Sequence, residues 1–115
     1  MTHKTFSRDV ADQMLDAETE RHIAEQKAAL EAAPDWAEGH LHLALLYRIH
    51  RRLRDEAKRE LLRALELKPS LAEAHIALGE MYVAEGDIAR AREHAEYAAQ
   101  FGNGRLLEQM KRYGG

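Results

Sequence analysis

Apolar residues recur along this chain at the spacing of one face of an α-helix, and no alternating, β-branched run indicates a strand. Alanine, leucine, glutamate and arginine, all good helix formers, dominate the segments between the breaks. The pattern predicts an all-α protein with five main helices and a short last one, over residues 7–33, 36–50, 54–67, 71–84, 88–101 and 104–113.

Local signals mark where these helices begin and end. Ser7 can cap the first helix, and Pro34 ends it. A glycine-aspartate pair separates the fourth helix from the fifth, with Asp87 as a natural N-cap, and Asn103 caps the last helix. The polar middle of the first helix, DAETER, leaves a kink or break near Ala17 open.

One stretch of sequence occurs twice. Pro34-Asp-Trp-Ala-Glu-Gly-His40 returns as Pro69-Ser-Leu-Ala-Glu-Ala-His75, a shift of 69 − 34 = 35 residues. A fixed period in this range is typical of stacked supersecondary units, each too small to bury its apolar face alone. Chains built in this way usually work by presenting a surface.

The second copy resembles a tetratricopeptide repeat, a motif of two antiparallel helices with small residues where they cross. Gly79 and Ala91 would let the two helices approach closely, and Tyr82 would fill the space between them. The residues that stand at the spacings of this motif are Ala72, His75, Leu78, Gly79, Tyr82, Gly86, Asp87, Ala91, Ala95 and Ala98.

The first copy is a looser match, and its turn lacks the glycine-aspartate pair. Tyr47 and Ala57 are 57 − 47 = 10 residues apart, against 91 − 82 = 9 for their counterparts, so the first turn carries one extra residue. Upstream, Ala29-Leu30-Glu31 before Pro34 looks like the tail of a preceding second helix. The residues that keep the pattern are His40, Leu43, Ala44, Tyr47, Ala57, Ala64 and Pro69.

This resemblance implies one domain of antiparallel helix-turn-helix repeats, stacked as a short right-handed α-solenoid. Its parts would be an N-terminal helix or half repeat (7–33), two repeats (36–68 and 71–102) and a C-terminal capping helix (103–113). It also implies a non-enzymatic protein-interaction module, an adaptor or assembly factor whose partner is a protein or peptide.

In this family the first helix of each repeat lines a concave groove. The expected groove is mostly apolar and lacks the lysine and asparagine with which family members grip a terminal carboxylate. We therefore expect it to hold an amphipathic helix of the partner. By register, the residues that point towards it are Leu41, Leu45, Arg48, Ile49, Ile76, Glu80 and Val83.

Other uses of the same surface stay open. The segment from Leu41 to His50 is apolar on nearly every side, as a fully buried helix is. The long first helix could fold back so that Phe6, Val10 and Met14 fill the groove. A homo- or hetero-oligomer would bury the same residues, which gives the alternative function of a structural subunit.

The chain has seven histidines, but their spacing does not indicate a metal site or a cofactor. His40 and His42 are two residues apart, and such residues project to different sides of a helix. His40 and His75 stand at equivalent positions of the two copies, and we interpret both as packing residues whose ring nitrogens find partners.

Basic residues gather around the first turn. The segment Arg48–Arg63 carries seven basic and three acidic residues, a net charge of 7 − 3 = +4. We interpret this segment as a solvated face with ion pairs along the helix. A nucleic-acid-associated function is the weaker alternative, because no aromatic residues are interleaved for base stacking. The central basic residues are Arg51, Arg52, Arg54, Lys58 and Arg59.

Composition narrows the function classes further. A chain of 115 residues is one domain, and its net charge of −3 points to no acidic or basic partner. Cysteine is absent, both serines are interpreted as caps, and no phosphate loop or H-E-x-x-H motif occurs, so no enzyme activity is expected. No apolar run approaches a membrane span or the core of a signal peptide, so a cytoplasmic location is expected.

Overall fold

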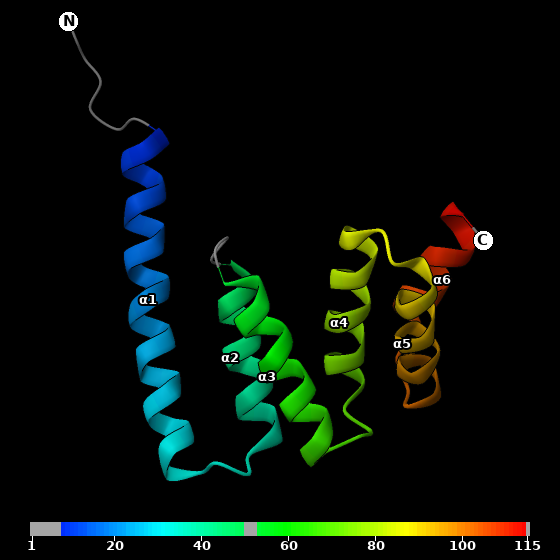
Figure 1. The fold of residues 1–115 in the computed structure, drawn as a ribbon, viewed down its shortest axis with the longest axis horizontal. Helices are drawn as coiled ribbons and strands as arrows, with labels where there is room; N and C mark the ends of the chain where they lie inside the picture. The colour runs from blue at the N-terminus through cyan, green and yellow to red at the C-terminus, as the bar shows by residue number, and fades with distance from the viewer. Residues whose placement is uncertain (1–7, 50–52, 115) are drawn as a thin grey trace, which may run out of the picture.

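The computed structural model describes residues 8–49 and 53–114, apart from the side chains of residues 8, 9, 11 and 12. Within these residues the chain forms six α-helices and no β-strand, which confirms the predicted all-α class (Figure 1). Two predicted helix ends, Ser7 and His50, lie outside the described residues, and every other predicted end is within one residue of the observed one. The helices are α1 (Arg8–Ala32), α2 (Ala37–Ile49), α3 (Arg54–Leu67), α4 (Ala72–Glu85), α5 (Ile88–Gln100) and α6 (Arg105–Tyr113).

The helices form a row with α1 at one end and α6 at the other (Figure 1). Helices α2 and α3 make one close antiparallel pair, and α4 and α5 make the second. Helix α1 packs against α2, α3 against α4, and α5 against α6. The radius of gyration is 16.6 Å, against about 13 Å for a compact domain of similar length. The molecule is therefore an extended, open row of helices, and its shortest dimension is 20 Å.

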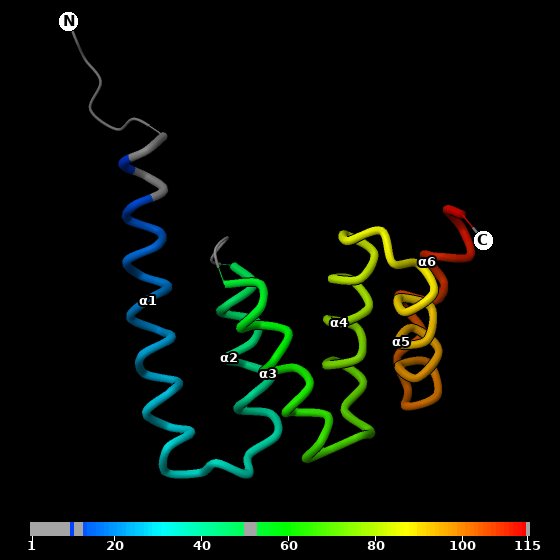
Figure 2. Tube along the Cα trace, in the orientation of Figure 1, coloured from blue at the N-terminus to red at the C-terminus, as the bar shows by residue number. Residues whose placement is uncertain are grey.

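The connections alternate between the two edges of this row. Those between α1 and α2 and between α3 and α4 lie along one edge, and that between α4 and α5 lies along the opposite edge (Figure 2). Helices α2 and α4 begin 72 − 37 = 35 residues apart, whereas α3 and α5 begin 88 − 54 = 34 residues apart. The extra residue of the first copy therefore falls between the start of α2 and the start of α3, as predicted.

The predicted turn between α4 and α5 is present. Gly86 has a φ of 82°, a left-handed conformation that glycine adopts without a steric penalty, and it ends α4. The side chain of Asp87 then accepts a hydrogen bond from the backbone N–H of Arg90, 3.1 Å away. Asn103 lies one residue before the cap position of α6, which is Gly104, and its Oδ1 accepts from the N–H of Arg105.

Helix α1 runs without a break past Ala17, so the kink that its polar middle left open is absent. Thr19 is buried there, and its hydroxyl donates to the carbonyl oxygen of Leu15 at 2.9 Å. Val10 and Met14 are exposed, so they do not fill a groove; Phe6, the third residue of that alternative, lies outside the described residues. The long first segment is therefore a straight helix at the end of the row.

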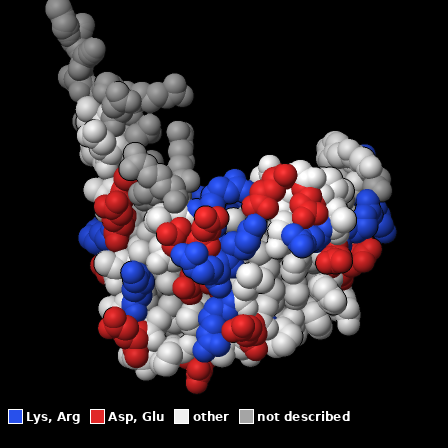
Figure 3. Space-filling model, in the orientation of Figure 1, with Lys and Arg blue, Asp and Glu red and all other residues white. Residues whose placement is uncertain are grey.

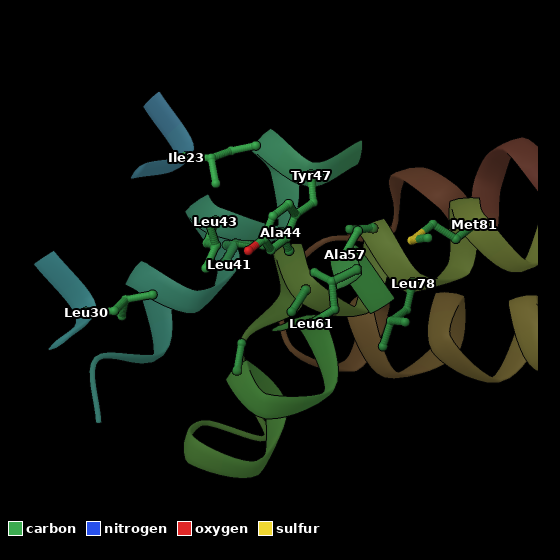
Figure 4. Packing of buried hydrophobic residues seen from close by; sticks show 13 residues of the cluster. Ile23, Leu30, Leu41, Leu43, Ala44, Tyr47, Ala57, Leu61, Leu78 and Met81 are labelled. Carbon is green, nitrogen blue, oxygen red and sulfur yellow. The ribbon is translucent and has the colours of Figure 1, made fainter. Parts of the chain in front are cut away.

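The larger hydrophobic core contains side chains from the first four helices, α1, α2, α3 and α4 (Figure 4). Ile23 and Leu30 extend from α1 onto α2, and Leu61 of α3 is fully buried. Alanines fill the contacts where helices cross, because a methyl group lets two backbones come close together. Its buried members are Ile23, Leu30, Leu41, Leu43, Ala44, Tyr47, Ala57, Leu61, Ala64, Ala74, Ala77, Leu78 and Met81.

A second, smaller core fastens α6 to the α4–α5 pair. Leu106 of α6 packs with Ile76 of α4 and with the alanines at 95 and 98 of α5. A methyl group added at Gly79 would lie only 2.4 Å from a methyl carbon of Leu106 and 3.4 Å from the carbonyl oxygen of Ala91. The close approach predicted for Gly79 and Ala91 is thus observed, and Gly79 also makes room for α6.

No helix in the described part of the chain has the length and apolar character needed to cross a membrane.

Candidate protein-docking surface

The residues predicted to line the groove separate into buried and exposed ones. Leu41 is 6% exposed and belongs to the larger core, and Ile76 is 2% exposed beneath α6. This corrects the expectation that these two side chains face an open groove. Leu41 packs with residues of α1, α3 and α4, and α6 covers Ile76, so both serve the packing of the row.

The other apolar groove residues stay exposed. Leu45 and Ile49 lie one turn apart on α2 and are 39% and 61% exposed, and Val83 of α4 is 41% exposed. We call these three residues the α2–α4 apolar surface. Exposed apolar side chains of this size on two alternate helices of the row are candidates for contact with a partner protein.

A line of charges crosses this face of the row. Glu80 of α4 accepts hydrogen bonds from Arg48 of α2 at 3.2 Å and from Arg105 of α6 at 3.3 Å, one on each carboxylate oxygen. Exposed pairs of this kind contribute about 0.2–1 kcal/mol each. Glu80 therefore links three alternate helices of the row. Sequence reasoning placed Arg48 and Glu80 on one face but missed Arg105, because no motif marks it.

A pocket of about 450 Å³ opens beside Val83 where α4, α5 and α6 meet. Its walls are mostly apolar and include Ile88, Met110 and Tyr113, with Arg92 and Gln109 as polar members. Sequence reasoning missed this pocket, because its walls come from three separate helices. The one signal available was the apolar spacing of Leu106, Met110 and Tyr113 along the last helix.

The repeated histidines make the same contact in both copies. Nε2 of His40 lies 2.8 Å from the carbonyl oxygen of Pro34, and Nε2 of His75 lies 2.9 Å from that of Pro69. Their Nδ1 atoms meet different partners: Glu60 at 2.6 Å for His40 and His94 at 3.0 Å for His75. The interpretation of both histidines as packing residues with partnered nitrogens is confirmed.

The partners of the two histidines occupy equivalent positions, since 94 − 60 = 34, the offset between the starts of α3 and α5. Nε2 of His75 donates to a carbonyl oxygen, which can only accept, and of the two facing Nδ1 atoms of His75 and His94 one donates to the other. Burial, and then the neighbouring His75, lower the pKa of His94. The second copy thus holds a pair of histidines where the first holds a histidine and a carboxylate.

Aromatic rings surround this pair. Tyr82 stacks on His94 with ring centres 5.6 Å apart, and Phe101 stacks on His75 at 5.9 Å. Tyr82 therefore lies between α4 and α5, as predicted, and the ammonium of Lys58 sits 4.6 Å from its ring centre. Among the described residues, no three histidine, aspartate or glutamate side chains are grouped so that they could hold a metal ion.

Trp36 packs at the start of α2, against Gly39. A methyl group added at Gly39 would lie 2.3 Å from the indole ring and 2.9 Å from a methyl carbon of Leu30. Gly39 therefore makes room for Trp36 and for α1 at the start of α2. The side chain of Gln26 strengthens the same junction by donating to the carbonyl oxygen of Gly39 at 3.2 Å.

The described residues of the basic cluster are held in ion pairs. Lys58 contacts Glu85 at 2.9 Å and Arg54 contacts the same carboxylate at 3.4 Å, while Arg59 pairs with Glu56 at 3.9 Å. The hydrogen bond from Lys58 is the main cause of the lowered pKa of Glu85. Acidic and basic side chains are interspersed on the face seen in Figure 3. Arg51 and Arg52 lie outside the described residues.

No protein-family model and no curated protein matches this chain.

Proposed function

We propose that this chain is a tetratricopeptide-type α-solenoid that acts as a non-enzymatic interaction module. Two features support the family. Helix pairs follow one another at 34–35 residues, and each pair begins with a proline whose carbonyl contacts a histidine six residues later. The open row of helices is also the shape that a short array of repeats would have.

The partner would be a protein helix or peptide with an apolar face. The observation that carries this proposal is the exposure of Leu45 and Ile49 one turn apart on α2, together with the exposure of Val83 on α4. Arg48 and Glu80, which pair with each other nearby, would remain at the rim of the contact. An apolar strip with a polar rim is the usual composition of a helix-binding surface.

The test uses the double variant Leu45→Glu/Ile49→Glu. Affinity capture with the wild-type chain would identify a binding partner, and the dissociation constant of the purified pair would then be measured. Burying two charges in an apolar contact should weaken binding at least about tenfold. The helical circular dichroism should stay unchanged, because both residues are exposed.

A matched control is available on α3. Leu62 is 45% exposed, and Leu62→Glu adds one negative charge outside the proposed surface. If Leu62→Glu weakens binding as much as the double variant does, or if the double variant binds like the wild type, the proposed surface is wrong. Ile76 is not used, since a buried charge there would unfold the α4–α6 contact.

A second candidate is a structural subunit whose apolar surfaces are permanently covered in an oligomer. The exposed side chains at the two ends of the row, among them Met14 and Tyr113, favour it. Light scattering separates the two candidates. An oligomer that persists on dilution supports the structural subunit, and a chain that is monomeric when dilute supports reversible binding. The cytoplasmic location stays a prediction, to be checked by cell fractionation.

A further inference from the structure

The first end of the row carries a helix that extends past its neighbour. Helix α1 has 25 residues and α2 has 13, which correspond to lengths of about 38 Å and 20 Å. The side chains of α1 that are buried begin at Thr19, and every side chain from Gln13 to Glu18 is exposed. Residues 8–18, which we call the α1 overhang, therefore extend beyond α2 (Figure 1).

The α1 overhang presents apolar side chains. Val10, Met14 and Leu15 are 38%, 56% and 57% exposed. Isolated helices shorter than about 12–15 residues are marginal in water. Among the described side chains of α1, none before Thr19 is buried, so another surface that covers these apolar side chains would stabilise the segment.

The opposite end of the row carries the apolar pocket between α4, α5 and α6. We call helix α6 together with Ile88 of α5 the α6 end, and its exposed apolar side chains beside the pocket are Ile88 and Tyr113. Ile88 is 48% exposed and Tyr113 is 79% exposed. The nine residues of α6 include one buried side chain, Leu106, so most of this helix faces away from the chain.

The two ends carry opposite charge. The α1 overhang has one basic and four acidic residues, a net charge of 1 − 4 = −3, and α6 has three basic and one acidic residue, a net charge of 3 − 1 = +2. Contact between two α1 overhangs or between two α6 ends would bring like charges together. Contact between an α1 overhang and an α6 end is therefore the pairing that electrostatics favours.

These two ends cannot meet within one chain, because they lie at opposite ends of a row whose longest dimension is 55 Å (Figure 1). We infer that the α6 end of one copy of this chain binds the α1 overhang of another copy. The contact is heterologous, since it joins two different surfaces, and it can repeat from copy to copy without closing. Val83, which lines the pocket, also belongs to the α2–α4 apolar surface, but Leu45 and Ile49 lie outside this contact, so it does not depend on the proposed function.

The test blocks each end separately. Met14→Lys/Leu15→Lys places two positive charges on the acidic α1 overhang, and Ile88→Glu/Tyr113→Glu places two negative charges on the basic α6 end. All four side chains are exposed, so both variants should keep the wild-type circular dichroism. Sedimentation velocity of the full chain should show a wild-type mass that rises with concentration beyond that of a dimer. Each blocked variant alone should stay at 13.1 kDa.

Mixing the two blocked variants gives the decisive measurement. Each variant retains the end that the other lacks, so the mixture should form a 1:1 dimer of 2 × 13.1 = 26.2 kDa and grow no further. The association should weaken between ~0.05 and ~0.5 M salt, because salt screens the opposite charges. Leu62→Glu, on the exposed face of α3, should behave like the wild type.

Two results would overturn the inference. The first is a wild-type chain that stays monomeric at its highest soluble concentration. The second is a contact located elsewhere, which would show as self-association that neither blocked variant removes or as a mixture of the two variants that fails to dimerise. Loss of partner binding in Leu45→Glu/Ile49→Glu with self-association intact would support both proposals separately.

Discussion

Replacing Leu106 by alanine tests how α6 is held on the row. Leu106 is 4% exposed and is the side chain of α6 that lies in the smaller core, against Ile76 and over Gly79. The change removes the one buried side chain of α6 and leaves a cavity between α4 and α6. The remaining anchors of α6 are the partly buried Leu107 and Met110, which pack against the same core, and polar contacts such as the ion pair between Arg105 and Glu80.

The expected cost follows from the burial. Leu→Ala changes at buried sites destabilise by about 2–5 kcal/mol, depending on how far the cavity collapses. A nine-residue helix is too short to persist alone in water, so α6 should detach and unfold before the rest of the chain. The loss in global stability is then limited to the free energy with which α6 docks.

Hydrogen exchange measured by mass spectrometry checks this directly. Amides of α6 should exchange at least about 30-fold faster in Leu106→Ala, the factor that corresponds to about 2 kcal/mol. Amides of α2 and α3 should keep their wild-type rates. Lys111→Ala, an exposed position on the same helix, is the control and should leave α6 protected.

The reasoning fails if α6 keeps its wild-type protection in Leu106→Ala. It also fails if exchange accelerates equally throughout α2 to α6, because the smaller core would then be part of one cooperative unit with the larger core.

Two further predictions follow from the cores and the histidine pair. Leu61→Ala should lower the free energy of unfolding by about 2–5 kcal/mol, because Leu61 is fully buried. The adjacent Leu62→Ala, at a 45% exposed position, should lower it much less. Urea denaturation measures both losses, and equal losses would contradict the assigned packing of α3. Because folding lowers the pKa of His94 from its ordinary value of 6.5, the unfolded chain takes up the proton first as the pH falls, and stability should decrease below that pH. The urea midpoints at pH ~7.5 and ~5.5 should differ less in His94→Gln than in the wild type. The control is His22→Gln, which alters an exposed ring and should behave like the wild type. If the difference in His94→Gln equals that of the wild type, the histidine pair does not cause the pH dependence of stability.

Helix positions could be predicted well because their signals are local. Pro34 ends α1, the Gly86–Asp87 turn separates α4 from α5, and the repeat of 35 residues places equivalent helices in register. The contacts inside each repeat were also within reach of the sequence. The duplication placed His40 and His75 at matching positions, and both contact the carbonyl oxygen of the proline six residues earlier.

The candidate surface was harder to predict, because burial depends on helices that are distant in sequence. Leu41, Leu45 and Ile76 were all expected on one groove face. In the structure, Leu45 is exposed, whereas Leu41 lies in the larger core and α6 covers Ile76. Helical periodicity indicates which side chains share a face, but it does not say whether another helix lies on that face.

The sequence by itself therefore determined the helices, their ends and the repeat, since hydrogen bonding along a helix and the special geometry of proline and glycine are properties of neighbouring residues. Only the tertiary structure decided which partner each repeated side chain meets: Glu60 for His40, His94 for His75, and both Arg48 and Arg105 for Glu80. It also decided that the row ends in an exposed α1 overhang and an apolar pocket at α6. These features arise where separate helices meet or fail to meet, and no local pattern records that arrangement.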